Sequence, residues 1–147
     1  MNILVAEDEA LIALWLSTLI EEAGHRLVGT CKSLEEAKRL SAANSPEMGI
    51  IDLRLGNKRC GASIDAHLAE AFGTTSIYLT ANRAFAHTYR RRAIGFIEKP
   101  IDGRAVLEAM AYVEDLRRGL VPPAPQHLNL FAPIGAASAL RLKSQTG

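Results

Sequence analysis

Cysteine and long apolar runs are both scarce in this sequence of 147 residues. The two cysteines, Cys31 and Cys60, are too few for a disulfide framework and neither belongs to a metal-binding pair, so we expect two reduced thiols. No apolar run approaches the ~20 residues of a membrane-spanning helix, and the first residues lack the regions of a signal peptide. These absences predict a cytoplasmic protein with no membrane partner.

An excess of charge of either sign is also lacking. The 17 basic and 16 acidic residues give a formal net charge of +1, which provides no field to attract nucleic acid. Acidic residues are absent after Asp115, and four of the six prolines follow Arg118. This change in composition predicts one domain over residues 1–118 and a proline-containing tail over residues 119–147, too short for a second domain with its own core.

Short apolar runs alternate with longer segments of helical periodicity, which is typical of an α/β domain with a parallel sheet. The runs are Ile3–Val5, Leu27–Val28, Gly49–Ile51, Ile77–Leu79 and Phe96–Ile97. Because successive residues in these runs are apolar, we expect strands that are covered on both faces. The sequence therefore predicts a doubly wound five-stranded parallel sheet.

Five helices are expected between and after these strands. They are predicted from Asp8 to Gly24, from Ser33 to Ala43, from Ser63 to Phe72, within Arg83–Arg92 and after Asp102. Ser33 and Glu36 have the spacing of a capping box, whereas the segment 83–92 is short and weakly patterned. In the first helix we expect one apolar stripe of Leu11, Leu14, Trp15, Thr18 and Leu19, and in the last an inward face of Val106, Ala109, Met110, Val113 and Leu116.

Polar side chains follow four of the predicted strands, at the point where each strand ends. Glu7 and Asp8 follow the first strand, Asp52 the third, Thr80 the fourth and Lys99 the fifth. Each residue alone has an ordinary explanation, such as a helix-start acid or a surface cation. Because ligands bind at the carboxyl ends of parallel strands, the joint placement indicates a functional site.

Carboxylates that lie within a few ångströms of one another repel unless a cation neutralises them. Oxygen ligands of this kind suit Mg²⁺ (or Mn²⁺). With the metal bound, one carboxylate can attack a phosphoryl group and hold it as an acyl phosphate. The lysine ammonium, the threonine hydroxyl and the backbone N–H after Thr80 would then bind the phosphoryl oxygens.

Four segments of the chain occur in a distinctive order: ILVAEDE (3–9), IIDLRL (50–55), YLTA (78–81) and GFIEKP (95–100). Together they resemble the receiver domain of the bacterial two-component response-regulator family, and the resemblance extends from Met1 to about Arg118. It implies a flavodoxin-like (βα)5 fold with the strand order 2-1-3-4-5.

The resemblance also implies a role for each site residue. Asp52 is the expected phosphoacceptor, and the expected Mg²⁺ ligands are Asp8, Asp52, Glu7 through water and the backbone carbonyl of Arg54. The expected phosphoryl-binding and switch residues are Thr80, Ala81 (through its backbone N–H), Lys99 and Phe96, and Pro100 is the expected cis-proline. Phosphorylation would shift Thr80 and Phe96 and so bias two pre-existing conformations.

The chain departs from the family pattern at two places. Arg54 stands two residues after the expected phosphoacceptor, where its side chain either overhangs the phosphoryl group or faces solvent. The segment between Thr80 and Lys99 is short, and the missing residues fall on the fourth helix. An altered fourth helix and the AEDEALIALWLSTLIEEAG opening both resemble an α-proteobacterial subgroup of the family.

The resemblance implies a single-domain response regulator with no separate effector domain. Its phosphoryl donor would be a histidine kinase or a histidine phosphotransfer protein, and phosphorylation would switch a protein-binding surface or drain phosphate from the kinase. A homodimer is one candidate assembly, and the tail is expected to pack through Leu128, Leu130 and Phe131.

The alternative is a pseudo-receiver that binds partners without accepting phosphate. An independent enzyme is not expected: a phosphatase with an aspartate nucleophile would need a second aspartate where Arg54 stands, and a nucleotide binder would need a glycine-rich loop after the first strand.

Overall fold

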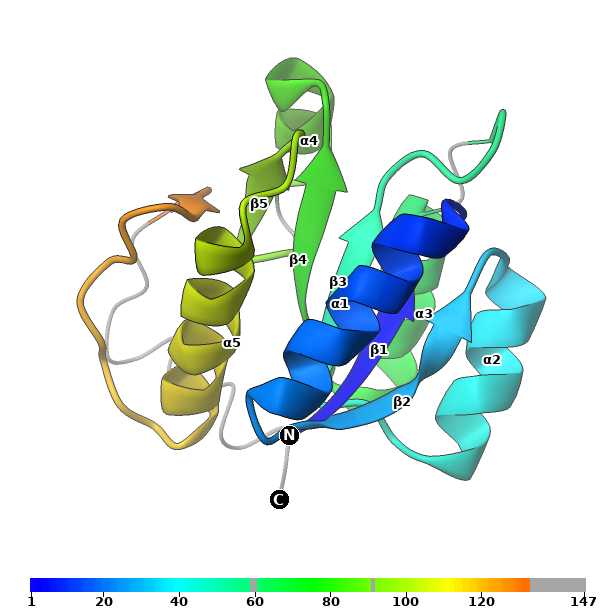
Figure 1. Ribbon diagram of the computed structural model, residues 1–147, viewed down its shortest axis with the longest axis horizontal. Helices are drawn as coiled ribbons and strands as arrows, with labels where there is room; N and C mark the ends of the chain where they lie inside the picture. The colour runs from blue at the N-terminus through cyan, green and yellow to red at the C-terminus, as the bar shows by residue number, and fades with distance from the viewer. Residues whose placement is uncertain (59–60, 91, 133–147) are drawn as a thin grey trace.

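The computed structural model describes residues 1–58, 61–90 and 92–132 (Figure 1). In chain order its elements are β1 (Asn2–Ala6), α1 (Ala10–Glu22), β2 (Arg26–Cys31), α2 (Leu34–Ala43), β3 (Met48–Asp52), α3 (Gly61–Phe72), β4 (Thr75–Thr80), α4 (Arg83–Thr88), β5 (Gly95–Glu98), α5 (Gly103–Arg117) and β6 (Asn129–Leu130).

The strands form one sheet in the order β2-β1-β3-β4-β5-β6. The first five are parallel, so the predicted fold and the predicted order 2-1-3-4-5 are confirmed. β6 is an addition that the sequence did not predict, and it pairs antiparallel with the outer edge of β5. The sheet therefore ends in a strand that comes from the tail rather than from the βα units (Figure 1).

Helices cover both faces of the sheet, which explains why β3 and β4 are buried at every position. α1 and α5 pack on one face, where Leu16, Val106 and Val113 meet the strands. α2, α3 and α4 pack on the other face through Ala37, Leu68 and Ala86 (Figure 1). The inward face predicted for the last helix is confirmed, since all five of its members are buried on α5.

The ends of the helices follow local capping chemistry. The Ser33 side chain accepts a hydrogen bond from the backbone N–H of Glu36 at 3.2 Å, and the Glu36 carboxylate accepts one from the N–H of Lys32 at 2.8 Å. At the starts of α4 and α5, the side chains of Asn82 and Asp102 each accept one hydrogen bond, from the backbone N–H of Phe85 and of Arg104 respectively. α4 is only six residues long, in agreement with the short fourth helix that the sequence predicts.

The stripe predicted for the first helix is wrong. Ala13, Leu16 and Ile20 are the buried residues of α1, whereas Leu11 is 82% exposed and Leu14 is 65% exposed. Trp15 is partly exposed and Thr18 is exposed, so only Leu19 of the predicted stripe packs on the core. Every residue from Ala10 to Leu16 is apolar, and periodicity therefore could not distinguish the inner face of the helix from its outer face.

The tail returns to the domain after α5. Leu128 is buried against the α1–α5 side of the sheet, together with partly buried Leu130. Phe131 packs against the opposite core. The expectation that these three residues anchor the tail is confirmed, and the tail from residue 133 onwards lies outside the described residues.

Cys31 is a free, buried thiol, and burial raises its pKa to about 12; Cys60 lies outside the described residues. None of the helices in the described ranges is long and apolar enough to cross a membrane.

Candidate functional site

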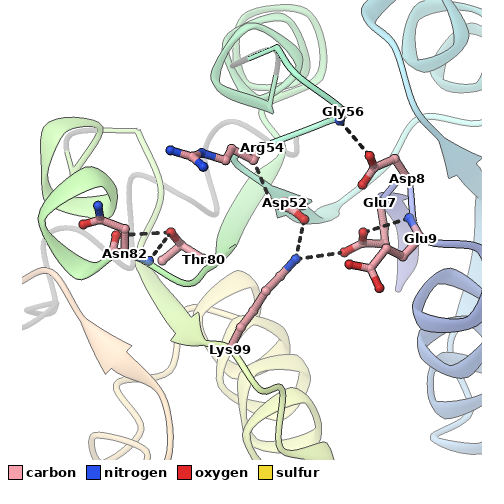
Figure 2. Close-up of polar contacts among 9 residues, drawn as sticks. All are labelled: Glu7, Asp8, Glu9, Asp52, Arg54, Gly56, Thr80, Asn82 and Lys99. Atoms are coloured by element: carbon pink, nitrogen blue, oxygen red, sulfur yellow. Dashed lines mark hydrogen bonds and ion pairs between the residues drawn. The ribbon is translucent and has the colours of Figure 1, made fainter.

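The carboxyl ends of β1, β3, β4 and β5 meet at one end of the sheet and bring the predicted side chains together (Figure 2). Glu7 and Asp8 follow β1, Asp52 ends β3, Thr80 ends β4 and Lys99 follows β5. Glu7, Asp52 and Thr80 are buried. The topology of the parallel sheet, rather than any local motif, therefore assembles the site.

Lys99 is the cation of the site. Its Nζ lies 2.5 Å from Asp52 Oδ2 and 3.7 Å from Glu7 Oε2 (Figure 2). Burial lowers the pKa of Lys99, but the hydrogen bond to Asp52 and the charges of Asp52 and Glu7 together raise it above its ordinary value. The ammonium therefore remains charged and partly neutralises the two carboxylates.

Glu7 is the least satisfied of the carboxylates. Its Oε1 accepts a hydrogen bond from the backbone N–H of Glu9 at 3.1 Å, whereas its buried Oε2 has no hydrogen-bond partner among the described residues. Burial, with a contribution from the charge of Asp52, raises the pKa of Glu7 to about 7. An acidic oxygen in this condition indicates a place for a further cation or its bound water.

Asp8 completes a group of three carboxylates. Oxygen atoms of Glu7, Asp8 and Asp52 all lie within 4.8 Å of one another. The other carboxylate oxygen contacts are few: Asp8 Oδ2 accepts from the backbone N–H of Gly56 at 2.7 Å, and Asp52 Oδ1 from that of Arg54 at 2.8 Å. An all-oxygen group in which one buried oxygen lacks a hydrogen bond fits a hard divalent cation such as Mg²⁺.

A small hollow lies on the other side of Asp52. It encloses about 200 Å³ and is lined by Asp52, Arg54, Thr80, Ala81, Asn82, Phe85 and Lys99. Asp52 and Lys99 are thus accessible from the hollow, although the Asp52 side chain is only 5% exposed. The predicted residues Thr80 and Ala81 lie here, together with Asn82 and Phe85, which the sequence reasoning did not select.

Thr80 is engaged with its own loop. Its hydroxyl accepts a hydrogen bond from the Asn82 N–H at 3.0 Å and donates one to the Asn82 carbonyl at 3.1 Å (Figure 2). Phe96 does not line the hollow, because its ring is buried beside His87 and Phe131. The Lys99–Pro100 peptide bond is cis.

Arg54 stands at the rim of this hollow. The residue is exposed to solvent, and it also lines the hollow beside Asp52. Figure 2 shows its guanidinium on the side of Thr80 and Asn82, away from Lys99. The side chain therefore faces solvent and also borders the space in front of Asp52.

Gly61, the first residue of α3, is a positioning residue that the sequence reasoning missed. A Cβ atom at this position would lie 2.1 Å from the Asp52 carbonyl oxygen and 2.8 Å from Leu53 Cα. Only glycine allows α3 to start so close to the end of β3. The sequence offers no direct signal for this contact, because a glycine in a polar loop is ordinary.

A family model described as the response regulator receiver domain matches residues 3–111. The chain therefore belongs to the response regulator receiver domain family. It is similar to the phyllosphere-induced regulator PhyR of Methylorubrum extorquens, with 32% identity over 81 residues that cover 54% of this chain and 30% of that protein. It is also similar to the transcriptional regulatory protein PdtaR of Mycobacterium tuberculosis, with 32% identity over 80 residues that cover 54% of this chain and 38% of that protein.

Solved structures agree on the fold. The receiver (REC) domain of PhyR from Erythrobacter litoralis matches with a TM-score of 0.71 and 23% identity, over 85% of this chain and 95% of that chain. The receiver domain of NtrX from Brucella abortus matches with a TM-score of 0.67 and 22% identity, over 76% of this chain and 96% of that chain. The matched segments cover less than half the length of the curated relatives described above.

The buried charge of Glu7 leads to a prediction about stability. Replacing Glu7 with glutamine removes one of three adjacent carboxylates, so we expect the free energy of unfolding without metal to rise by about 1 kcal/mol. Mg²⁺ should raise the melting temperature of the wild-type protein and raise that of Glu7→Gln much less. Glu9→Gln is the matched control, because Glu9 is exposed and contacts Glu7 only through its backbone N–H. Equal stabilisation of the wild-type and Glu7→Gln proteins by Mg²⁺ would contradict the assignment of Glu7 to the cation site.

Proposed function

We propose that this receiver domain accepts a phosphoryl group on Asp52 from the phosphohistidine of a histidine kinase or a histidine phosphotransfer protein. The observation that carries the proposal is the setting of Asp52. Its carboxylate is buried between a lysine ammonium and two further carboxylates, and it borders a small hollow. This is the arrangement that an aspartate nucleophile for phosphoryl transfer requires.

In the transfer, an Asp52 carboxylate oxygen forms the new P–O bond while the P–N bond to the donor histidine breaks, and the imidazole leaves. Lys99 Nζ, already 2.5 Å from Asp52 Oδ2, would exchange part of this contact for a phosphoryl oxygen. The Thr80 hydroxyl and the Ala81 N–H, both at the small hollow, would bind further phosphoryl oxygens. For Thr80 this requires the loss of its present bonds to Asn82.

Asp8, Asp52, Glu7 and the Arg54 carbonyl would hold Mg²⁺, with Glu7 acting through bound water. The ion would supply positive charge that offsets repulsion between the incoming phosphoryl group and the carboxylates. Arg54, at the rim of the small hollow, would add a second positive charge and restrict the approach of hydrolytic water.

The surface beside Asp52 supports a protein as the donor rather than a small molecule alone. Leu11, Leu14 and Trp15 on α1 are exposed. Of these three, Trp15 also lines an apolar hollow of about 550 Å³, together with Ile12, Lys99, Pro100 and Ile101. An apolar surface that shares Lys99 with the phosphoacceptor site suits a helical donor protein that brings its histidine to Asp52.

The output in this proposal is a change in protein contacts. Movement of Thr80 toward the phosphoryl group would open space for Phe96, and the surface of α4, β5 and α5 would change. The protein would then regulate a partner or serve as a phosphate sink, and its only chemistry would be its own phosphorylation and dephosphorylation. The presence of Asp52, Lys99 and the carboxylate pair disfavours the alternative of a pseudo-receiver.

Phosphoryl labelling tests the proposal. With Mg²⁺ and either acetyl phosphate or a phosphorylated histidine kinase, we expect an acid-stable but alkali-labile label on the wild-type protein and none on Asp52→Asn. Chelation of the metal should abolish labelling. A wild-type protein without label, or an Asp52→Asn protein that retains it, would overturn the proposal, and Asp102→Asn provides a matched control because Asp102 caps α5 outside the site.

A further inference from the structure

The outer edge of β5 is paired with a short strand from the tail. Gly95 and Phe96 of β5 face Leu130 and Asn129 of β6. The Phe131 N–H donates to the Ile94 carbonyl at 3.1 Å, and Asn129 Nδ2 donates to the Phe96 carbonyl at 3.4 Å. Without these contacts β5 would present unpaired backbone groups at the end of the parallel sheet, and such an edge binds extended chains.

Gly95 is suited to this pairing. A Cβ atom at position 95 would lie 2.4 Å from the Asn129 carbonyl oxygen, and its three nearest neighbours all belong to Asn129 and Leu130. The glycine therefore makes room for an added strand rather than for another part of the domain. Because glycine has only a hydrogen as its side chain, the backbone of another strand can approach the edge of β5 closely.

An aromatic surface lies next to this edge. The Phe131 ring centroid is 5.4 Å from that of His87, 5.5 Å from that of Phe96 and 6.2 Å from that of Tyr78. Three elements, α4, β4 and β5, thus surround one aromatic side chain of the tail. Contacts of this geometry are favourable beyond the apolar area that they bury.

Polar groups fix the direction of the strand. Arg83 donates to Asn129 Oδ1 at 3.4 Å and lies 5.8 Å from the centre of the Phe96 ring. Before the strand, both carboxylate oxygens of Glu108 contact His127, one at its backbone N–H (2.8 Å) and one at Nδ1 (2.7 Å). These contacts, the backbone pairing and the aromatic surface form one continuous binding site.

We propose that the edge of β5 and the aromatic surface of Tyr78, His87 and Phe96 bind an extended partner strand that carries an aromatic side chain, and that residues 128–131 hold this site in the resting protein. β6 is only two residues long. Such a short pairing is weak by itself, so a partner strand that makes the same contacts and adds further ones can replace it.

This site at the edge of β5, the strand site, can bind a strand without phosphorylation of Asp52. Its regulation by phosphorylation rests on the proposed function. Phe96, which contacts Phe131, is the residue expected to move when Asp52 is phosphorylated. Movement of the Phe96 ring would weaken its contact with Phe131 and increase access to the strand site. Phosphorylation would then favour partner binding by release of the tail.

A labelled peptide of residues 126–132 (QHLNLFA) tests the site in the full-length protein. In Phe131→Ala the tail loses its aromatic anchor while the site stays intact, so the peptide should bind at least about ten-fold more tightly than to wild type. In Gly95→Ala the new Cβ blocks any strand at the edge of β5, and the peptide should not bind. A peptide with alanine in place of its phenylalanine should bind Phe131→Ala roughly thirty-fold more weakly.

Circular dichroism and labelling of Asp52 show whether each variant is folded and whether the phosphoacceptor site is intact. Equal peptide binding by Phe131→Ala and Gly95→Ala, or no binding by folded Phe131→Ala, would overturn the strand site. Failure of Asp52 labelling with peptide binding intact would overturn the proposed function and the link to phosphate, and leave the strand site supported. If labelling succeeds and the Mg²⁺–beryllium fluoride adduct does not increase peptide binding to wild type, the link to phosphate is overturned.

Discussion

Replacing Lys99 with methionine is expected to slow phosphorylation of Asp52 by about 10²–10³-fold, because it removes a preorganised donor to the phosphoryl group. It should also lower the free energy of unfolding without metal by about 2 kcal/mol. That is less than the loss for a fully buried ion pair, since the Lys99 side chain is 23% exposed. Mg²⁺ should bind the variant more tightly than wild type, because Asp52 and Glu7 lose their only close cation among the described residues.

The opposite signs of these effects distinguish the role of Lys99 from a general structural one. Labelling rates, urea unfolding and calorimetric Mg²⁺ titration measure the three quantities. Lys99→Arg keeps the charge and should recover most of the stability but only part of the rate, because a guanidinium has a different shape and donor geometry. If Lys99→Met is labelled at the same rate as the wild-type protein, Lys99 Nζ does not contact the phosphoryl group.

Replacing Gly61 with alanine should destabilise the protein by about 2–3 kcal/mol, although alanine is normally the better helix residue. The added Cβ would overlap the Asp52 carbonyl oxygen and the Leu53 backbone. These are backbone atoms, so the overlap can be relieved only by moving α3 or the end of β3. Because that movement displaces Asp52, the proposed phosphoacceptor, we also expect labelling of Asp52 to fall.

Gly103→Ala provides the matched control. Gly103 is likewise the first residue of a helix, but a Cβ there would meet only the side chains of Trp15, at 3.3 Å, and Leu19. We expect its free energy of unfolding to stay within about 1 kcal/mol of wild type. If urea unfolding finds the two variants equally stable, the close approach of α3 to β3 does not constrain residue 61.

The fold could be predicted because its strands are buried on both faces. Runs such as Gly49–Ile51 and Ile77–Leu79 are apolar on successive residues, and this pattern distinguishes a covered parallel strand from a half-exposed one. The candidate site could be predicted from the same assignment of strands. Once the strands are placed in parallel, Asp52 and Lys99 must lie at the same end of the sheet, although 47 positions separate them.

The orientation of α1 could not be predicted from the residues alone. Leu11 and Leu14 are as apolar as Leu16 and Ile20, and a helix that is apolar on most sides gives no preferred inner face. The structure buries the second pair and exposes the first. Trp15, which is also exposed, lines the apolar hollow beside Lys99, and the proposed function gives this exposed side chain a partner to contact.

Gly61 and β6 were missed for a different reason. Both depend on contacts between segments distant in sequence, and neither has a periodic pattern. The Asn129–Leu130 pair is too short to register as a strand, and its role becomes visible only when Phe131 is placed against Phe96. Sequence patterns report how a residue relates to its own element, whereas these features concern how two elements approach each other.

The attachment of β6 to the same chain sets a threshold for any molecule that competes with it. Because the tail is tethered to α5, the effective concentration of β6 at the edge of β5 is roughly millimolar. A free partner present at micromolar concentration must therefore bind about a thousand-fold more tightly than the tail to occupy half of the molecules. A partner with a second contact on the domain meets a lower threshold, and so the tether selects for multivalent partners.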